Sequence, residues 1–249
     1  MLTNERHAFI LNLLAEKQTI KTQDIVEMTA ASESTIRRDF SDLENQQKLM
    51  RVFGGAVLPD RNLIEPSVAD KSTKHLAEKI RLAKFAASFV EEQDSVFLDA
   101  GTTTFQMIPY LKGKNIVVVT NGLTLVEALN DNGIPAYVTG GRIKARTGAL
   151  VGAQAMHSLE QYRFDVCFLG VNGFHPEFGY TTPDPEEAAV KRRASSLARN
   201  TYVLADHSKF NKVSFVKIMD LDEAVLVVDE MSGNDLATLE AKTIVKVGN

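Results

Sequence analysis

The sequence has little of what marks secreted, metal-bound or membrane-spanning proteins. Its single cysteine, Cys167, excludes an intramolecular disulfide, and no cysteines and histidines cluster at the spacing of a metal site. No apolar run reaches the roughly 20 residues that span a bilayer, and residues Met1–Arg6 do not resemble a signal peptide. We therefore expect a cytoplasmic protein that needs no metal, no cofactor and no membrane.

The composition is that of a soluble globular chain but does not identify its partners. The 249 residues are 44% hydrophobic and 24% charged, enough for one large domain or for two unequal ones with an ordinary core. A net charge of −4 argues against nucleic acid, because Lys and Arg must neutralise the phosphates. Four basic residues nevertheless fall together: Arg37, Arg38, Lys48 and Arg51. A compact basic face favours specific, salt-sensitive DNA binding, although composition alone leaves both alternatives open.

The first 58 residues read as three short helices followed by a β-hairpin. Apolar residues of the first helix recur at helical spacing. Thr22 is expected to cap the second helix, and Ser32 or Ser34 the third. Short apolar runs on either side of Gly54–Gly55 predict two strands joined by a turn. The predicted order is helix, helix, turn, helix and wing.

The rest of the chain predicts a second, larger domain. Residues 59–74 are polar and unpatterned and read as an interdomain linker, and a helix is predicted to follow from about residue 74 to 91. Short apolar runs then alternate with helical stretches at residues 95–98, 116–119, 136–138, 166–169, 202–204 and 224–228. Such runs joined by helices predict a parallel sheet covered on both faces. The expected domains are therefore residues 1–58, 59–74 (the linker) and 75–249.

The third predicted helix has one apolar and one polar face. Ile36, Phe40 and Leu43 lie in one stripe and face the core. The opposite face carries Ser34, Arg38, Ser41 and Asn45, with Thr35 and Arg37 at its flanks. Hydroxyls and a helix N-terminus bind phosphates, and an arginine can pair bidentately with guanine, so this face suits the major groove. The alternative is a helical bundle whose polar face meets water.

Small and polar residues follow four of the predicted strands, in the stretches Asp99–Thr104, Thr120–Gly122, Thr139–Gly141 and Gly170–Gly173. Ligands of open parallel sheets bind beyond the carboxyl ends of the strands. In the first stretch Gly101 lets backbone amides converge, and the threonine hydroxyls and the next helix N-terminus favour an anion. The spacing matches neither a Walker A loop nor a dinucleotide fingerprint. Ordinary strand-to-helix turns are the alternative for each stretch.

Two further groups of charged residues could reach the same edge of the sheet. Glu187 and Lys191 lie four apart on a predicted helix. They form either a surface pair contributing about 0.2–0.5 kcal/mol, or a site in which Lys191 reaches a ligand hydroxyl or phosphate. Residues Asp206–Lys209 follow another strand, and an Asp, a Ser and a Lys there suit hydrogen bonds to sugar hydroxyls. His207 among them is more typical of a loop than of a catalyst.

The N-terminal stretch resembles the signature of the DeoR family of bacterial repressors. The match is carried by Arg6, Ile10, Leu14, the run Ser32–Phe40, and the run Leu49–Ala56, which looks like that family's wing. The resemblance implies that the third helix enters the major groove and that the wing contacts the DNA backbone. The candidate DNA-binding residues are Thr22, Ser32, Ser34, Thr35, Arg37, Arg38, Lys48 and Arg51. Asp39 would repel phosphate, so we expect it to orient an arginine or to cap local structure.

The later blocks resemble the sensor domain of the same family. The match is carried by Asp99–Thr103, Thr120–Gly122, Gly140–Gly141, Gly170–Gly173, Glu187–Lys191 and Ala205–Lys209. It implies a fold similar to ribose-5-phosphate isomerase and a response to phosphorylated sugars. Residues 105–111 and 178–185 look closest to fructose operon repressors, which suggests fructose 1-phosphate as the inducer. The candidate effector-binding residues are Asp99, Gly101, Thr102, Thr103, Thr104, Asn121, Gly122, Gly140, Gly141, Asn172, Gly173, Glu187, Lys191, Asp206, Ser208 and Lys209.

The expected fold class is α/β, with an N-terminal winged helix-turn-helix and a C-terminal parallel-sheet sensor domain. The expected function is repression of a sugar operon, relieved by a phosphorylated sugar. The expected partners are double-stranded operator DNA, the effector, and further copies of the chain in a homodimer or homotetramer. The alternative is a sugar-phosphate isomerase with an appended helical module, because Glu187, Asp206 and Lys191 or Lys209 could supply a base and an electrophile. An isomerase has no need of a DNA-binding signature, so we do not expect an enzyme.

Overall fold

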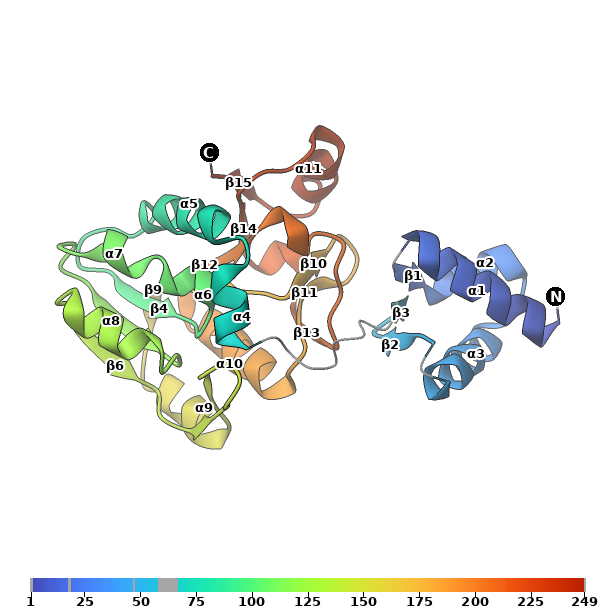
Figure 1. The fold of residues 1–249 in the computed structure, drawn as a ribbon, viewed down its shortest axis with the longest axis horizontal. Coiled ribbons are helices and arrows are strands. Elements are labelled where there is room, and N and C mark those ends of the chain that lie inside the picture. Colours follow the sequence, from blue (N-terminus) through green and yellow to red (C-terminus); the bar gives the residue numbers. More distant parts are fainter. Residues whose placement is uncertain (1, 18, 47, 58–66, 249) are drawn as a thin grey trace.

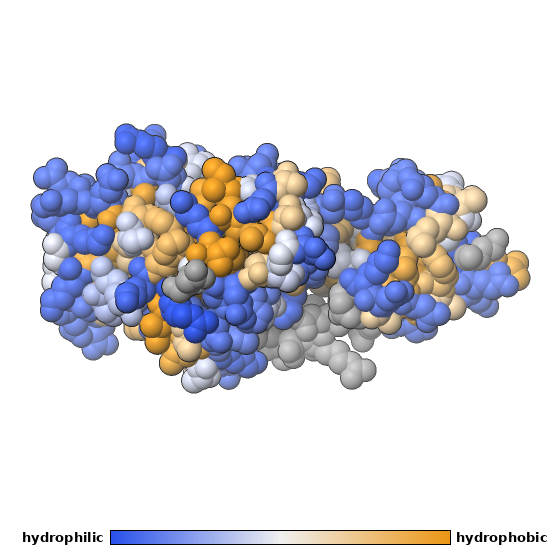
Figure 2. All heavy atoms as spheres, turned by 90° about the horizontal axis from the view of Figure 1, so that it is seen from above, coloured by the Kyte–Doolittle hydropathy of each residue, from blue (hydrophilic) through white to orange (hydrophobic). Residues whose placement is uncertain are grey.

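The computed structural model describes residues 2–17, 19–46, 48–57 and 67–248. The part up to residue 57 forms a small domain at one end of the molecule, and the part from residue 67 forms a larger domain beside it (Figure 1). Hydrophilic residues cover much of the face seen in Figure 2, and a hydrophobic patch lies on the larger domain. None of the helices in these ranges is long and apolar enough to cross a membrane.

The small domain is a bundle of helices edged by an antiparallel sheet. Its elements are α1 (Thr3–Lys17), β1 (Thr19–Lys21), α2 (Thr22–Thr29), α3 (Glu33–Asn45), β2 (Met50–Val52) and β3 (Gly55–Val57). β3 lies between β1 and β2 in the sheet. The apolar stripes of the helices meet in one core that includes Ile10, Leu14, Ile25, Ile36, Phe40 and Leu43. The predicted helices and wing are confirmed, and β1 is a strand that the sequence did not predict; Leu58, expected in the wing, lies outside the described residues.

The predicted cap of the third helix is confirmed, whereas that of the second is wrong. Ser32 precedes α3, and its hydroxyl accepts a hydrogen bond from the amide of Thr35 at 3.2 Å. Thr22 is instead the first residue within α2, and the preceding Lys21 makes no side-chain cap. The reason is the unpredicted strand β1: Thr22 leaves the strand directly, and its amide donates to the carbonyl of Gly54 at 2.8 Å.

The larger domain is built on a parallel sheet, as predicted. Its strands, in order across the sheet, are β15 (Val245–Val247), β14 (Val225–Val228), β12 (Ala198–Ala205), β9 (Phe164–Gly170), β4 (Ser95–Leu98), β5 (Val117–Thr120) and β6 (Ala136–Val138). All of these pairings are parallel. The carboxyl ends of β4, β5, β9 and β12 therefore lie at one edge, which is where the polar stretches follow.

Helices cover both faces of this sheet. They are α5 (Leu76–Ala87), α6 (Thr102–Phe105), α7 (Ile108–Leu111), α8 (Leu125–Asp131), α9 (Ala153–Leu159), α10 (Pro185–Ser196) and α11 (Gly233–Glu240). Val96 and Leu98 of β4 pack in the cluster that contains residues of α5, α7 and α8, whereas Phe97 packs in the cluster that contains residues of α9 and α10. Because neighbouring strand residues point to opposite faces and are apolar on both, the strand has no solvent-facing side.

Several shorter elements complete the larger domain. An antiparallel sheet is formed by β10 (Gly173–His175), β11 (Gly179–Thr182) and β13 (Val216–Met219), and a two-stranded one by β7 (Arg142–Ile143) and β8 (Leu150–Val151). The remaining turns are the 3-10 helices η1 (His207–Lys209) and η2 (Leu221–Glu223).

The expected linker, residues 59–74, differs from a plain connection. Its later part contains helix α4 (Val68–Thr73), capped by a reciprocal pair in which Ser67 accepts from the amide of Asp70 and Asp70 accepts from the amide of Ser67. The earlier part, up to residue 66, lies outside the described residues.

A buried ion pair joins α1 to α3. Asp39 accepts hydrogen bonds from Arg6 Nε at 2.5 Å and Nη2 at 2.9 Å, and its Oδ1 lies 3.1 Å from Nε2 of His7. Arg6 is 7% exposed and Asp39 is 3% exposed. Burial would raise the pKa of Asp39, but the hydrogen bonds from Arg6 and His7 outweigh it and hold the pKa below its usual value. The expectation that Asp39 orients an arginine is confirmed.

We predict that Asp39→Ala destabilises the small domain by about 3–5 kcal/mol, because it leaves the buried Arg6 guanidinium without its partner. Hydrogen exchange of the α1 and α3 amides in the full chain measures the loss. The control is Glu33→Ala, which breaks the exposed i,i+4 pair with Arg37 and should cost no more than about 0.5 kcal/mol. Equal protection in both variants would contradict the prediction.

Candidate DNA-binding face and effector cavity

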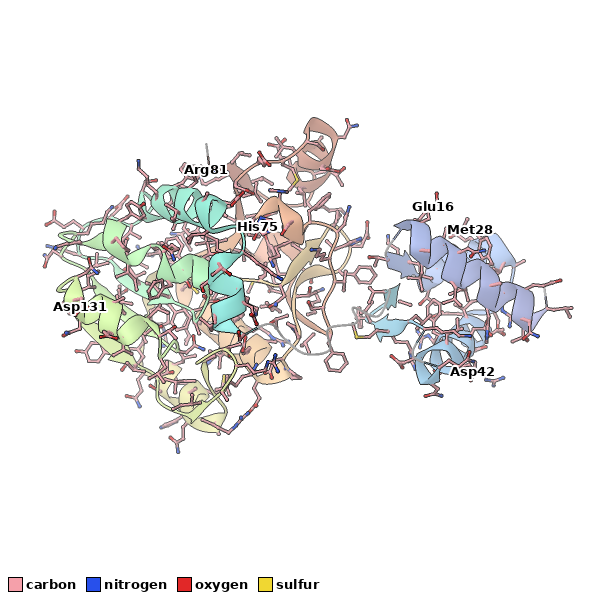
Figure 3. The ribbon with its side chains drawn as sticks, viewed as in Figure 1. Glu16, Met28, Asp42, His75, Arg81 and Asp131 are labelled. Atoms are coloured by element: carbon pink, nitrogen blue, oxygen red, sulfur yellow. The ribbon has the colours of Figure 1, made fainter. Side chains whose placement is uncertain are left out.

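The predicted DNA-binding residues of α3 share one exposed face. Those at the start of the helix are Ser32, Ser34, Arg37 and Arg38, with Thr35 partly buried beside them. Arg37 pairs with Glu33 at 2.5 Å, while Arg38 has no hydrogen bond or ion pair with the described residues. Asp42 follows four residues after Arg38 and points outward (Figure 3). The basic character is therefore limited to the N-terminal half of α3.

The wing is fastened to the same face. Arg51 of β2 donates a hydrogen bond from Nη1 to Ser41 Oγ at 2.6 Å, and its amide donates to Glu44 Oε1 at 2.8 Å. Lys48, between α3 and β2, is exposed. Gly54 makes the turn of the wing with φ +80°, a left-handed conformation that glycine adopts without strain. Arg51 and Lys48 thus stand beside α3, whereas Thr22 begins α2 and its amide donates to the carbonyl of Gly54 in the turn of the wing.

A cavity of about 80 Å³ opens at the predicted edge of the parallel sheet. The predicted residues that line it are Gly101, Thr102, Thr103, Asn121, Asn172, Glu187, Lys191, Asp206 and Lys209. The predicted residues outside its lining are Asp99, Thr104, Gly122, Gly140, Gly141, Gly173 and Ser208. The structure therefore brings together polar side chains from four strand ends and from α10.

Asp99 lies beneath the cavity and organises it. Its Oδ2 accepts hydrogen bonds from Lys191 Nζ and from the amide of Gly170 at 2.8 Å. Its Oδ1 accepts from the amide of Gly101 at 2.9 Å and from Thr104 Oγ1 at 2.8 Å. A Cβ on residue 101 would lie only 2.7 Å from Asp99 Oδ1, so the loop requires glycine. The amide of Gly101 and the hydroxyl of Thr104 therefore serve the loop itself.

Glu187 and Lys191 do not form a surface pair, so that alternative is wrong. They are 7% and 8% exposed, and each has a partner other than its neighbour on α10. Lys191 binds Asp99, whereas Glu187 Oε1 accepts hydrogen bonds from Lys144 Nζ at 2.7 Å and Thr147 Oγ1 at 2.8 Å. This region of the cavity is thus close to charge-neutral.

Asn121 has an unused acceptor. The side chain is 3% exposed and lines the cavity, and its Nδ2 donates to the carbonyl of Leu150 at 3.2 Å. Its Oδ1 is buried and has no hydrogen-bond partner among the described residues. Leaving a buried acceptor unpaired costs about 1–3 kcal/mol, so a ligand that donates a hydrogen bond here would recover that free energy.

Comparisons with known proteins match both parts of the chain. Residues 6–62 match the model of the DeoR-like helix-turn-helix domain, and residues 74–230 match that of the DeoR C terminal sensor domain. The chain belongs to the DeoR family. It is therefore a transcriptional regulator with a helix-turn-helix domain and a sensor domain, and not an enzyme.

Relatives of this DeoR-family regulator extend over its full length. An uncharacterized HTH-type transcriptional regulator of Bacillus subtilis strain 168, FruR, is 45% identical over 99% of both chains. A putative aga operon transcriptional repressor of Escherichia coli O157:H7 is 35% identical over 92% of this chain and 87% of the relative. Among solved structures, ribose 5 phosphate isomerase A from Neisseria gonorrhoeae matches with 19% identity and a TM-score of 0.41, over 53% of this chain and 52% of that one. Because this superposition covers only about half of each chain, it says nothing about activity.

The cavity residues of this DeoR-family regulator that the sequence did not indicate include three from α4 and α5. Val68 and Lys71 come from α4, and Lys79 comes from the first turns of α5. Lys79 is 6% exposed, and its Nζ donates a hydrogen bond to the carbonyl of Lys71. Its spacing from the buried Leu82 and Ala83 on α5 could have placed it on the inner face. A buried lysine needs a tertiary partner, however, which the helical period alone does not supply.

The wing contacts the sensor domain through the β10–β11 hairpin. Lys21 Nζ lies 2.8 Å from Glu177 Oε2, and a Cβ on Gly54 would lie 4.0 Å from the ring of Phe178. Figure 1 shows this hairpin on the side of the larger domain that faces the small one. The ring of His175 packs on Phe178 with centroids 4.9 Å apart, and burial lowers the pKa of His175 to about 4. The hairpin therefore connects the cavity, which Asn172 lines, to the wing.

The loop that carries Asp206 and Lys209 is anchored by a neighbouring acid. The amide of His207 donates to Asp229 Oδ1 at 2.8 Å, and its Nδ1 lies 3.0 Å from Oδ2. That hydrogen bond raises the pKa of His207. His75, at the start of α5 (Figure 3), meets the His207 ring edge-on with centroids 6.1 Å apart. Glu230 brings a third potential ligand atom to within 4.8 Å, but His207 and Asp229 are already paired with each other.

The raised pKa of His207 predicts a pH-dependent anchor. A histidine whose pKa is raised on folding contributes stability that is complete below its unfolded value, about 6.5, and is lost as pH rises through the folded value. We therefore expect the Tm difference between the native chain and His207→Asn to be larger at pH 5.5 than at pH 9. Thermal unfolding at both pH values measures it, and His157→Asn is the exposed control. A difference independent of pH would contradict the prediction.

Proposed function

We propose that the chain is a sequence-specific repressor that releases operator DNA when a phosphorylated sugar binds the cavity. One observation carries the proposal: a DeoR-family chain joins an exposed, arginine-bearing recognition helix to a cavity lined by lysines and hydrogen-bonding side chains. The effector that we infer is fructose 1-phosphate. This choice is supported by the resemblance of residues 105–111 and 178–185 to fructose operon repressors and by the name FruR of the Bacillus subtilis relative.

Operator recognition is assigned to α3 and the wing. The N-terminal turn of α3 presents Ser32, Ser34 and Thr35 to phosphates, and Arg38 is placed to reach base edges in the major groove. Lys48 and Arg51 are placed to neutralise phosphates beside it. In a homodimer or homotetramer, two such helices would enter successive major grooves about one helical turn apart, so the operator would contain paired half-sites.

Effector recognition divides between the two ends of the cavity. Asn121 and Asn172 supply amide groups for sugar hydroxyls, and the acceptor of Asn121 is unmet in the described structure. Lysines supply charge for a phosphate. This combination fits a small polyhydroxylated anion better than a nucleotide, because the described residues that line the cavity offer no aromatic surface for a base. The interpretation as an isomerase is set aside, since the family is one of regulators.

We predict that Arg38→Ala weakens binding to DNA of its own promoter region by about tenfold or more, because one bidentate base contact is worth about 1–3 kcal/mol. Binding of fructose 1-phosphate should stay unchanged. Titration of promoter DNA with and without the sugar phosphate measures both, and Lys17→Ala removes the same charge from the end of α1 as a control. Native protein whose DNA affinity responds to no sugar phosphate would refute the sensing half of the proposal.

Coupling between the two sites is assigned to the β10–β11 hairpin. The hairpin begins after Asn172 at the cavity, and its tip meets Lys21 and Gly54 of the small domain. The ion pair between Lys21 and Glu177 is about 40% exposed on both sides, so it contributes little stability and can exchange readily. An allosteric coupling of about 1–3 kcal/mol, or 5–150-fold in DNA affinity, is of the size that such contacts can supply.

We predict that Glu177→Lys reduces the ratio of DNA affinities measured without and with fructose 1-phosphate, because it places two cations at the tip contact. The double variant Glu177→Lys with Lys21→Glu restores an ion pair and should restore most of the ratio. Direct titration of the sugar phosphate checks that the cavity itself is unchanged. A single variant with the native ratio would exclude the hairpin as the coupling element.

A further inference from the structure

Three lysines meet at one end of the cavity, and each comes from a different element. Lys71 belongs to α4, Lys79 to α5 and Lys209 to η1, and all three line the cavity. We propose that the anionic group of the effector binds among Lys71, Lys79 and Lys209, and that it thereby fixes helix α4 onto the sensor domain. The proposal rests on the proposed function, because it assigns the phosphate end of the same effector.

The geometry concentrates positive charge at this end. Lys79 is 6% exposed, and Lys71 and Lys209 are both partly buried. Among the described residues, the acids that line the cavity are Asp206 and Glu187, and Glu187 already binds Lys144 and Thr147. Asp206 Oδ1 accepts hydrogen bonds from the amide and hydroxyl of Ser208. An anionic group placed among the three lysines would accept charge-assisted hydrogen bonds from them.

The titration behaviour of the lysines agrees with this picture. Burial lowers the pKa of both Lys79 and Lys209, and Asp206 only partly opposes the effect. The charges of Lys209 and Lys71 lower the pKa of Lys79 further, as the charge of Lys71 does for Lys209. The ammonium groups therefore repel one another in the absence of an anion, and an anion would convert this repulsion into attraction.

The threonine loop is the competing place for the anion, and its strongest donors are already occupied. The amide of Gly101 and the hydroxyl of Thr104 both donate to Asp99. Thr102 and Thr103 still line the cavity and could add neutral hydrogen bonds. At the opposite, charge-neutral region, the unmet acceptor of Asn121 needs a donor, which a sugar hydroxyl has and a phosphate dianion does not. The effector would thus bind with its phosphate toward α4 and its hydroxyls toward Asn121.

Helix α4 gives this placement a regulatory consequence. None of its residues is fully buried, and its backbone contacts include the bond from the amide of Val68 to the carbonyl of Arg146 at 3.0 Å and the bond from Lys79 to the carbonyl of Lys71. Figure 1 shows α4 beside α6, at the point where the chain enters the sensor domain from the small domain. A phosphate that bridges Lys71 to Lys79 and Lys209 would add charged hydrogen bonds across this junction.

The experiment measures two probes, fructose 1-phosphate and inorganic phosphate, by calorimetry and thermal shift on the full chain. Lys71→Met, Lys79→Met and Lys209→Met should each weaken fructose 1-phosphate by about tenfold or more and abolish stabilisation by inorganic phosphate. Asn121→Ala should weaken the sugar phosphate but leave inorganic phosphate unaffected. Lys84→Met, an exposed lysine of α5, is the matched control. Lys79→Arg keeps the charge and should recover part of the affinity if Lys79→Met folds poorly.

Hydrogen exchange of residues 67–73 gives a second readout, in which inorganic phosphate should slow exchange in the native chain but not in Lys79→Met.

Loss of phosphate binding in Thr103→Val, together with native affinity in the lysine variants, would overturn the proposal and place the anion at the threonine loop. If inorganic phosphate binds in a lysine-dependent way but fructose 1-phosphate does not bind, the anion subsite is supported and fructose 1-phosphate is refuted as the effector. Failure of both probes to bind would overturn the subsite, whereas the sensing function falls only if DNA binding also ignores every phosphorylated sugar.

Discussion

The cavity that we propose for the effector depends on the buried carboxylate of Asp99. Its two oxygens bind Lys191 of α10, the amide of Gly170 at the end of β9, and the amide of Gly101 and hydroxyl of Thr104 in its own loop. The Asp99 side chain thus fixes the ends of the neighbouring strands β4 and β9 and also helix α10. A buried charge is tolerated only when it is paired and hydrogen-bonded, and removing one partner costs about 3–5 kcal/mol. The position of the loop is therefore set before any ligand arrives.

That arrangement divides the cavity into two regions that differ in net charge. Asp99 neutralises Lys191, and Glu187 is held by Lys144 and Thr147, so this region offers hydrogen bonds without net charge. The end beside α4 holds Lys71, Lys79 and Lys209 around Asp206. A ligand that matches both regions must carry hydroxyls at one end and an anion at the other. The same division explains why the glycine and threonine turn after β4 need not itself hold an anion.

The sequence predicts the helices and strands whose residue pattern is local. It does not predict features that depend on a contact with a residue far along the chain. Buried strands contain short continuous apolar runs, such as residues 166–169 of β9 and 202–204 of β12, and the polar residues after them must meet at one edge, so most of the cavity lining follows. The sequence favours Thr22 as a cap because β1, which pairs with β3 across the wing, gives no periodic signal in three residues. Helix α4 lies in a polar segment whose only signal is the Ser67–Asp70 capping pair. The burial of Lys79 depends on the carbonyl of Lys71, which no helical period identifies.

The energies of the two domains limit how the effector can act on DNA. The small domain is held by the buried Arg6–Asp39 pair, whose disruption would cost about 3–5 kcal/mol. An allosteric coupling free energy of about 1–3 kcal/mol is too small to disrupt that ion pair, so effector binding would leave α3 and its core intact. The contact between Lys21 and Glu177 is exposed and weak enough to change, and α4 has no fully buried residue. Under the proposed function, effector binding would therefore move the small domain as a rigid body and alter the spacing of the recognition helices in an oligomer.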